Sequence, residues 1–170
     1  YIGVSGGLFR DMMIHDFDMA RWLLGEEPTR IYATGSVMVD PAIGEAGDVD
    51  TASVTLSTAS GAIAIITNSR RANYGYDQRV EAFGAGGMLQ ANNNLESNVV
   101  RSGAEGIIGA KPQFFFLERY ADAYRIELTR FVEALQGNTV PPTTADDGLK
   151  ALALADAAKQ SFDSGMRVAL

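Results

Sequence analysis

The chain has no cysteine and a single histidine in 170 residues. Without cysteine, disulfide bonds, thiolate catalysis and cysteine-ligated zinc are excluded. Long apolar runs are also missing, because the longest, such as Ala62–Thr67, are far shorter than the about 20 residues that cross a bilayer. We therefore expect no membrane span and no secretory leader, and a reducing, cytoplasmic location is compatible with this composition.

Positive charge is scarce in this sequence. The chain has 14 lysines and arginines against 21 aspartates and glutamates, which gives a net charge of −7 and an isoelectric point near 4.6. The basic residues are scattered rather than clustered, which disfavours nucleic acid and anionic membrane surfaces as partners. An apolar content of 46% over this length is enough for one domain with a hydrophobic core.

Six segments have the β-branched residues and partial alternation of strands, and short turns separate them. These segments are Arg30–Met38, Val49–Thr58, Ala62–Arg71, Arg79–Phe83, Met88–Ala91 and Asn98–Arg101. Short turns favour antiparallel pairing, because parallel strands need long crossovers. Helices are predicted at Phe9–Leu24, Leu117–Gln136 and Thr144–Asp163. The predicted fold class is α+β, an open, mostly antiparallel sheet of about six strands with helices on one face.

The one histidine lies in a narrow polar stripe of the first predicted helix. At about 100° per residue, His15 falls between Asp11 and Asp18 on one face, with Trp22 beside them and apolar residues opposite. Carboxylates beside an imidazole can fix its tautomer and raise its basicity, which suits proton abstraction. Asp16 falls inside the apolar arc and must find donors there or point along its edge.

Two other interpretations of this stripe are open at this point. His15 can be a surface histidine salt-bridged to its i−4 and i+3 neighbours, which is worth a few tenths of a kcal/mol. The same side chains can instead bind magnesium or manganese, although one histidine with carboxylates is a poor ligand set for zinc.

Two further segments invite a functional interpretation. The segment Gly84-Ala85-Gly86-Gly87 is rich in glycine like a phosphate loop, but it lies between two predicted strands and lacks the G-x-G-x-x-G spacing. A hairpin turn is therefore the better interpretation. Tyr74 follows the third strand, where tyrosines usually pack, although a phenolic hydroxyl is also suited to binding a polyol.

Two separate motifs of the chain resemble a known family. The first reads Gly6-Gly7-x3-Asp11-x3-His15-x2-Asp18-x6-Gly25, and the second runs from Phe131 through Pro141-Pro142 and Gly148 into the alanine-rich end of the chain. Both resemble the C-terminal domain of the glucose–fructose oxidoreductase / inositol dehydrogenase / rhizopine-catabolism (Gfo/Idh/MocA) family. The His-Asp-Phe-Asp form of the first motif and the run from Phe115 to Tyr120 resemble the inositol 2-dehydrogenase branch.

The resemblance implies a two-domain oxidoreductase in which residues 1–170 form the C-terminal substrate-binding and oligomerisation domain. An N-terminal Rossmann domain, absent from this chain, would bind NAD or NADP, and a lysine of its E-K-P motif would complete the site. The chain starts at Tyr1 and a helix is predicted within its first ten residues. We therefore expect it to be the later part of a longer protein.

The same resemblance assigns roles to individual residues. His15 matches the acid/base histidine that takes the hydroxyl proton as a hydride leaves for the nicotinamide. Asp11 matches the acidic residue that binds a substrate hydroxyl and orients the imidazole, and Asp18 matches an acid that supports them from behind. Tyr74 aligns with a tyrosine that contacts substrate. No metal is implied.

The predicted function is NAD-dependent oxidation of a secondary alcohol of a cyclitol or sugar, with myo-inositol as the expected substrate. We expect a homo-oligomer, a dimer or tetramer, that associates through the open face of the sheet, and an inactive protein if this domain is isolated. Two alternatives stay open: a non-catalytic oligomerisation or ligand-binding module of the same fold, and a metal-dependent hydrolase that binds a divalent ion through His15.

Overall fold

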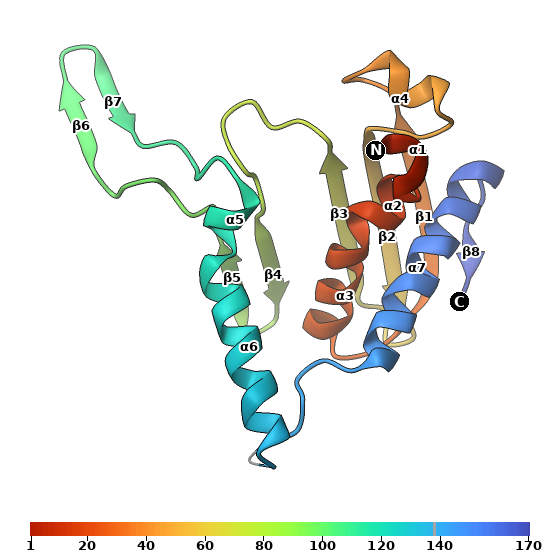
Figure 1. Cartoon of the computed structure of the whole chain (residues 1–170). Coiled ribbons are helices and arrows are strands. Elements are labelled where there is room, and N and C mark those ends of the chain that lie inside the picture. Colours follow the sequence, from red (N-terminus) through yellow and green to blue (C-terminus); the bar gives the residue numbers. More distant parts are fainter. Residues whose placement is uncertain (138) are drawn as a thin grey trace. The chain divides into compact units, whose positions relative to one another are not determined.

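The computed structural model describes residues 1–137 and 139–170 (Figure 1). These residues form two compact units. The helix–sheet unit consists of Tyr1–Arg71 and Thr143–Leu170, and the hairpin unit consists of Ala72–Pro142. Both units are built from antiparallel strands and helices, so the predicted α+β class is confirmed.

The sheet of the helix–sheet unit has four strands in the order β3-β2-β1-β8. They are β1 (Pro28–Ser36), β2 (Thr51–Thr58), β3 (Ile63–Ser69) and β8 (Val168–Ala169). All neighbours are antiparallel. The short β8 was not predicted, because two residues are too few to show a period; it closes the edge of the sheet by pairing Val168 with Ile31.

The prediction of a single sheet of about six strands was wrong in its organisation. The later strands form separate two-stranded hairpins in the hairpin unit, and only four strands share a sheet. Hydrophobic alternation identifies strands but does not specify which strands pair across longer loops.

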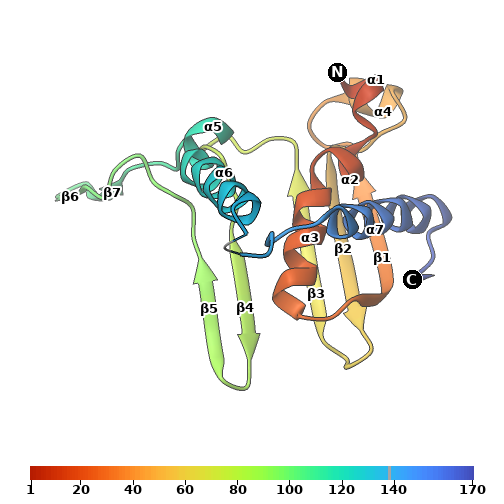
Figure 2. The same ribbon diagram turned by 60° about the horizontal axis from the view of Figure 1, so that its bottom comes forward.

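Five helices belong to the helix–sheet unit among its described residues. They are α1 (Ile2–Ser5), α2 (Leu8–Asp11), α3 (Met13–Leu24), α4 (Pro41–Glu45) and α7 (Ala145–Ser164). Helices α3 and α7 lie across one face of the sheet (Figures 1 and 2). The opposite face leaves Tyr32, Ile63 and Ile65 exposed.

The helix predicted at Phe9–Leu24 is interrupted at Met12, whose φ of −116° departs from helical geometry. A continuous helix would place Leu8 at about 60° on the helical wheel, beside His15 on the exposed face. The interruption turns α2 so that Leu8 is fully buried. The apolar face of α3 is as predicted, because Met13 and Phe17 are also fully buried.

The core of the helix–sheet unit lies between its sheet and these helices. Its fully buried side chains are aliphatic or aromatic with few exceptions: Leu8, Met13, Phe17, Ile31, Val54, Leu56, Ala155 and Ala158. Helix α7 begins with the predicted capping box, in which Thr144 and Asp147 satisfy each other's backbone N–H groups, and ends at Gly165 in the left-handed conformation.

Among its described residues, the hairpin unit contains two hairpins and two helices. They are β4 (Val80–Gly84) with β5 (Gly87–Ala91), β6 (Val100–Gly103) with β7 (Gly106–Gly109), α5 (Phe116–Arg119) and α6 (Ala121–Leu135). The edge of the Tyr76 ring meets Tyr120 at a centroid distance of 5.6 Å, and the Tyr120 hydroxyl donates to Gln78. These contacts connect the start of this unit to the beginning of α6.

Candidate functional site

His15 lies in the first turn of α3 with an exposed side chain. Among the residues that the structure describes, no hydrogen bond or ion pair involves its imidazole, and neither Asp11 nor Asp18 is bonded to it. The predicted stripe is interrupted, because His15 and Asp18 lie on α3 whereas Asp11 lies on α2 and is largely buried, and its carboxylates have other partners. An imidazole placed this way has both ring nitrogens available to a ligand.

Asp11, the last residue of α2, is held by groups from two other segments. The Tyr1 hydroxyl donates to one carboxylate oxygen, and Arg70 Nη1 donates to the other at 2.8 Å. Arg70 Nη2 also binds Asp48 at 3.2 Å, and Asp48 accepts the backbone N–H of Leu8 at 3.0 Å. Only 11% of the Arg70 side chain is exposed, with 14% for Asp11 and 10% for Asp48.

This largely buried Asp11–Arg70–Asp48 triad fixes the position of the Asp11 carboxylate. Burial alone would lower the pKa of Arg70, but its hydrogen bonds to Asp11 and Asp48 raise it above the ordinary value. The guanidinium therefore stays charged and holds both carboxylates in place. Both carboxylate oxygens of Asp11 accept hydrogen bonds in this arrangement.

Asp16 points from α3 toward β3, where Asn68 Nδ2 donates to its carboxylate at 2.9 Å. The hydrogen bond from Asn68 satisfies the Asp16 carboxylate, which the sequence placed within the apolar arc of this helix. Burial raises the pKa of Asp16, while the amide of Asn68 and the positive charge of His15 act in the opposite direction.

Asp18, on α3, is paired with Arg21, whose Nη1 is 3.0 Å from the Asp18 carboxylate. Arg21 is buried and also binds Glu27 at 2.7 Å and Asp147 at 3.3 Å. The hydrogen bonds that Arg21 donates to Glu27 are the main reason that the pKa of Arg21 is raised. Asp18 therefore belongs to an ion-pair cluster that ties the end of α3 to the start of α7.

Tyr74 belongs to the hairpin unit, where its hydroxyl donates to Asp77. Arg79 and Asn93 also donate to Asp77, each at 2.7 Å. The Arg79 guanidinium, together with the other donors, lowers the pKa of Asp77 to about 2. Because the proton of Tyr74 is directed to a carboxylate, its oxygen lone pairs are left for an outside donor.

The sequence analysis did not identify Asn68 on β3, which binds Asp16, or Arg70 just after β3, which binds Asp11. Ile66 on β3 is buried against the helices. Side chains on a strand alternate between its faces, so Asn68 and Arg70 continue on the side of Ile66. That alternation could have placed both polar residues next to α2 and α3, but it does not reveal which acids they bind.

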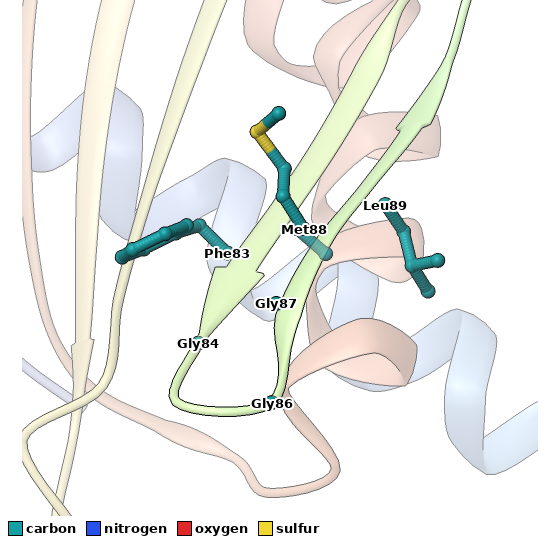
Figure 3. Close-up of a pocket in the computed structure, with 7 residues that line it drawn as sticks. Phe83, Gly84, Gly86, Gly87, Met88 and Leu89 are labelled. Atoms are coloured by element: carbon teal, nitrogen blue, oxygen red, sulfur yellow. The ribbon is translucent and has the colours of Figure 1, made fainter.

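The glycine-rich segment forms the predicted hairpin turn, with Gly84 paired to Gly87. A hollow of about 390 Å³ lies at this turn. Figure 3 shows Phe83, Met88 and Leu89 around it. All its lining residues are apolar or glycine, so it provides no charged group for a phosphate.

Two absences bear on the other classes of function. Within residues 1–137 and 139–170, no group of three or more histidine, cysteine, aspartate or glutamate side chains is placed to hold a metal ion. In that same part of the chain, no helix has both the length and the apolar character needed to span a bilayer.

An antiparallel sheet covered on one face by helices, one of which displays an exposed histidine, defines an α+β domain. Residues 2–90 match the family model described as the GFO/IDH/MocA C-terminal domain. The chain belongs to this family. The resemblance seen in its two sequence motifs is thereby confirmed.

Similar proteins include several inositol dehydrogenases. The chain is 51% identical over 170 residues to the myo-inositol 2-dehydrogenase of Thermotoga maritima, and the match covers all of this chain and 51% of that protein. The structure of a myo-inositol dehydrogenase from Corynebacterium glutamicum matches with a TM-score of 0.93 and 44% identity, over 100% of this chain and 51% of that one.

A scyllo-inositol dehydrogenase from Lactobacillus casei, with bound NAD(H) and scyllo-inositol, matches with a TM-score of 0.88 and 34% identity. That match covers 97% of this chain and 48% of the other. The chain spans about half the length of the curated relatives it matches.

Proposed function

We propose that this chain is the C-terminal, substrate-binding domain of an NAD-dependent dehydrogenase that oxidises a secondary alcohol of a cyclitol, with myo-inositol as the substrate. The observation that carries the proposal is the exposed His15 imidazole, which has no hydrogen-bond partner among the described residues and follows a firmly held Asp11 by four positions. The inositol dehydrogenases among its relatives support the choice of substrate.

The proposed cofactor is NAD, which accepts a hydride from the alcohol carbon when it is bound. The relative from Lactobacillus casei, whose structure contains NAD(H), supports this assignment. The glycine-rich turn at Gly84–Gly87 is an apolar hairpin and does not fit a dinucleotide phosphate. We therefore assign cofactor binding mainly to an N-terminal Rossmann domain beyond this chain.

In this proposal His15 is the base. It takes the proton of the reacting hydroxyl on a ring nitrogen, and the alcohol carbon becomes a carbonyl carbon once its hydride has left. Asp11 binds a substrate hydroxyl, because each of its oxygens retains a free lone pair beside the bonds from Tyr1 and Arg70. Tyr74 of the hairpin unit is kept as a further proposed substrate-binding residue, because its hydroxyl donates to Asp77 and its oxygen can still accept a hydrogen bond.

The proposal extends to assembly and location. The sheet face opposite α3 and α7 exposes Tyr32, Ile63 and Ile65, and we assign it to contact with a second copy of the protein in a dimer or tetramer. We place the enzyme in the cytoplasm, a setting with which the cysteine-free composition is compatible.

The test is NADH formation by the full-length protein with myo-inositol, scyllo-inositol and glucose as substrates. Replacing His15 by glutamine is expected to lower kcat/KM by about 10²–10⁴-fold, the usual contribution of a general base. Lys159→Gln, which removes an exposed partner of Asp163 on α7, is the matched control and should retain activity. Full activity in His15→Gln would make the histidine structural, and no turnover of any polyol by the wild-type enzyme would refute the dehydrogenase itself.

A further inference from the structure

Asp11 ends a helix that is too short to hold its own orientation. Helix α2 consists of the four residues Leu8–Asp11, and two backbone hydrogen bonds close it, from Asp11 N–H to the Gly7 carbonyl at 2.9 Å and from Met12 N–H to the Leu8 carbonyl at 3.1 Å. A single helical turn is only marginally stable by itself. The direction of the Asp11 side chain therefore depends on contacts from outside α2.

One side chain, Arg70, holds both ends of α2. At the first residue of the helix, the Leu8 N–H donates to Asp48 at 3.0 Å, and Arg70 Nη2 lies 3.2 Å from that same carboxylate. At the last residue, Arg70 Nη1 lies 2.8 Å from Asp11. The nitrogens of a guanidinium are fixed in one plane, so Arg70 sets the separation of the two carboxylates between which α2 lies.

We propose that Arg70 is a positioning residue that holds the Asp11 carboxylate in the orientation in which it accepts a substrate hydroxyl, while Asp48 fixes the guanidinium from its other side. The inference deepens the proposed function and rests on it, because it assigns the group that orients the proposed substrate-binding acid. Arg70 itself acts only through Asp11.

The hydrogen bonds of this cluster support orientation as its role. Arg70 Nε is buried with no hydrogen-bond partner among the described residues, which lowers stability. Apolar side chains in place of a buried ion cluster are often at least as stabilising, so stability alone does not require these charges. The cluster instead supplies a carboxylate of fixed direction, because one oxygen of Asp11 accepts from Arg70 and the other from the Tyr1 hydroxyl.

The first test measures the kinetics of the full-length protein with myo-inositol. Arg70→Lys keeps the positive charge but loses the planar group that binds both carboxylates. We expect KM to rise about tenfold, the effect of one weakened hydrogen bond to a charged group, while kcat stays within about twofold of wild type. Arg10→Lys is the matched control, because Arg10 is also on α2 but pairs with Asp156 at 2.6 Å, and its KM should not change.

A double-mutant cycle separates positioning from a general structural role. If Arg70 acts through Asp11, Arg70→Lys should raise KM no further in a protein that already carries Asp11→Asn. Effects that multiply, an equal rise in Arg10→Lys, or an unchanged KM in a folded Arg70→Lys protein would overturn the inference. An unchanged KM in Asp11→Asn would refute the proposed role of Asp11 and the inference with it.

Asp48→Asn is the second variant, for use if circular dichroism shows that Arg70→Lys does not fold. It keeps a side-chain oxygen for the Leu8 N–H but removes the charge that binds Arg70. KM should rise in the same direction by a smaller factor, and only while Asp11 is present. An unchanged KM in this variant would overturn the inference.

A measurement that needs no turnover distinguishes failure of the inference from failure of the proposed function. Hydrogen exchange of the Met12 amide reports the bond that closes α2, and we expect it to be about tenfold faster in Arg70→Lys and unchanged in Arg10→Lys, whose ion pair is exposed. Unchanged exchange in Arg70→Lys would show that Arg70 does not hold α2, which overturns the inference. Faster exchange in an enzyme that oxidises no polyol would refute the proposed function alone and leave Arg70 as the group that orients Asp11.

Discussion

Arg70 connects the end of β3 to the turn between α2 and α3 through a 2.8 Å ion pair with Asp11, and both side chains are almost completely buried. The same guanidinium binds Asp48, so three charged groups share one buried site. Charges in such a site are stable only together, because each has lost its hydration and relies on the others. The triad therefore couples the stability of this region to the geometry of the candidate site.

Replacing Arg70 by methionine is expected to destabilise the protein by about 3 kcal/mol, since it leaves two buried carboxylates without a cation. Urea unfolding of the full-length protein measures this change. Arg71→Met removes an exposed arginine next to it and should change the free energy of unfolding by less than about 0.5 kcal/mol. Similar effects of the two substitutions would show that the triad contributes nothing to stability.

The buried carboxylate of Asp50 is expected to make the stability of the folded protein depend on pH. It is fully buried, and although burial raises its pKa, the backbone N–H groups of Met38, Asp40 and Val39 and the hydroxyl of Thr51 lower the pKa to about 2. The native state therefore binds this proton more weakly than the unfolded chain. The resulting stabilisation is complete above about pH 4 and is lost as the pH falls toward about 2.

Asp50→Asn is expected to remove about 2 kcal/mol of stability near neutral pH and to flatten the loss of stability between about pH 4 and about pH 2. Thermal unfolding across this range measures both effects. Asp163→Asn, an exposed acid paired with Lys159, is the control and should leave the slope unchanged. A wild-type slope that persists in Asp50→Asn would assign the acid sensitivity to other carboxylates.

The sequence allowed the class of fold and most of the longer helices and strands to be predicted because these depend on local periodicity, whereas the break at Met12 and the short β8 were not predicted. The capping box at Thr144 and the buried face of α3 are examples, since each involves residues within a few positions of one another. The partners of Asp11 and Asp16 could not be predicted, because they lie 59 and 52 residues away and are chosen by strand pairing. The carboxylates of the predicted polar stripe bind Arg70, at the end of β3, and Arg21 rather than the imidazole.

Gly75, in the hairpin unit, occupies a position that has no room for a side chain. Its φ is +138°, and a Cβ atom there would lie 2.7 Å from the Pro112 carbonyl oxygen. Gly75→Ala is expected to destabilise this unit by about 3 kcal/mol, because backbone strain and a clash with another backbone segment add. Faster amide exchange of Tyr76, whose N–H donates to Gln113 at 2.8 Å, would report the change.

Gly61→Ala provides the matched comparison for Gly75. Its φ is +92°, but no described atom lies within 4 Å of the position that an added Cβ would take, so only the backbone strain of about 1 kcal/mol applies. If both substitutions had equal effects, the close approach of Pro112 to Gly75 would not matter for stability.

Tyr74 offers a test of substrate binding that is separate from proton transfer. If its oxygen accepts a substrate hydroxyl, Tyr74→Phe removes one hydrogen bond, worth about 1 kcal/mol, in both the ground state and the transition state. KM for myo-inositol is then expected to rise about fivefold to tenfold while kcat stays close to wild type. Tyr124→Phe, at an exposed tyrosine of α6 with no proposed role, controls for the loss of a phenol hydroxyl and should leave KM unchanged. A fall in kcat with unchanged KM would instead place Tyr74 in the chemical step, and wild-type values of both would limit it to holding Asp77.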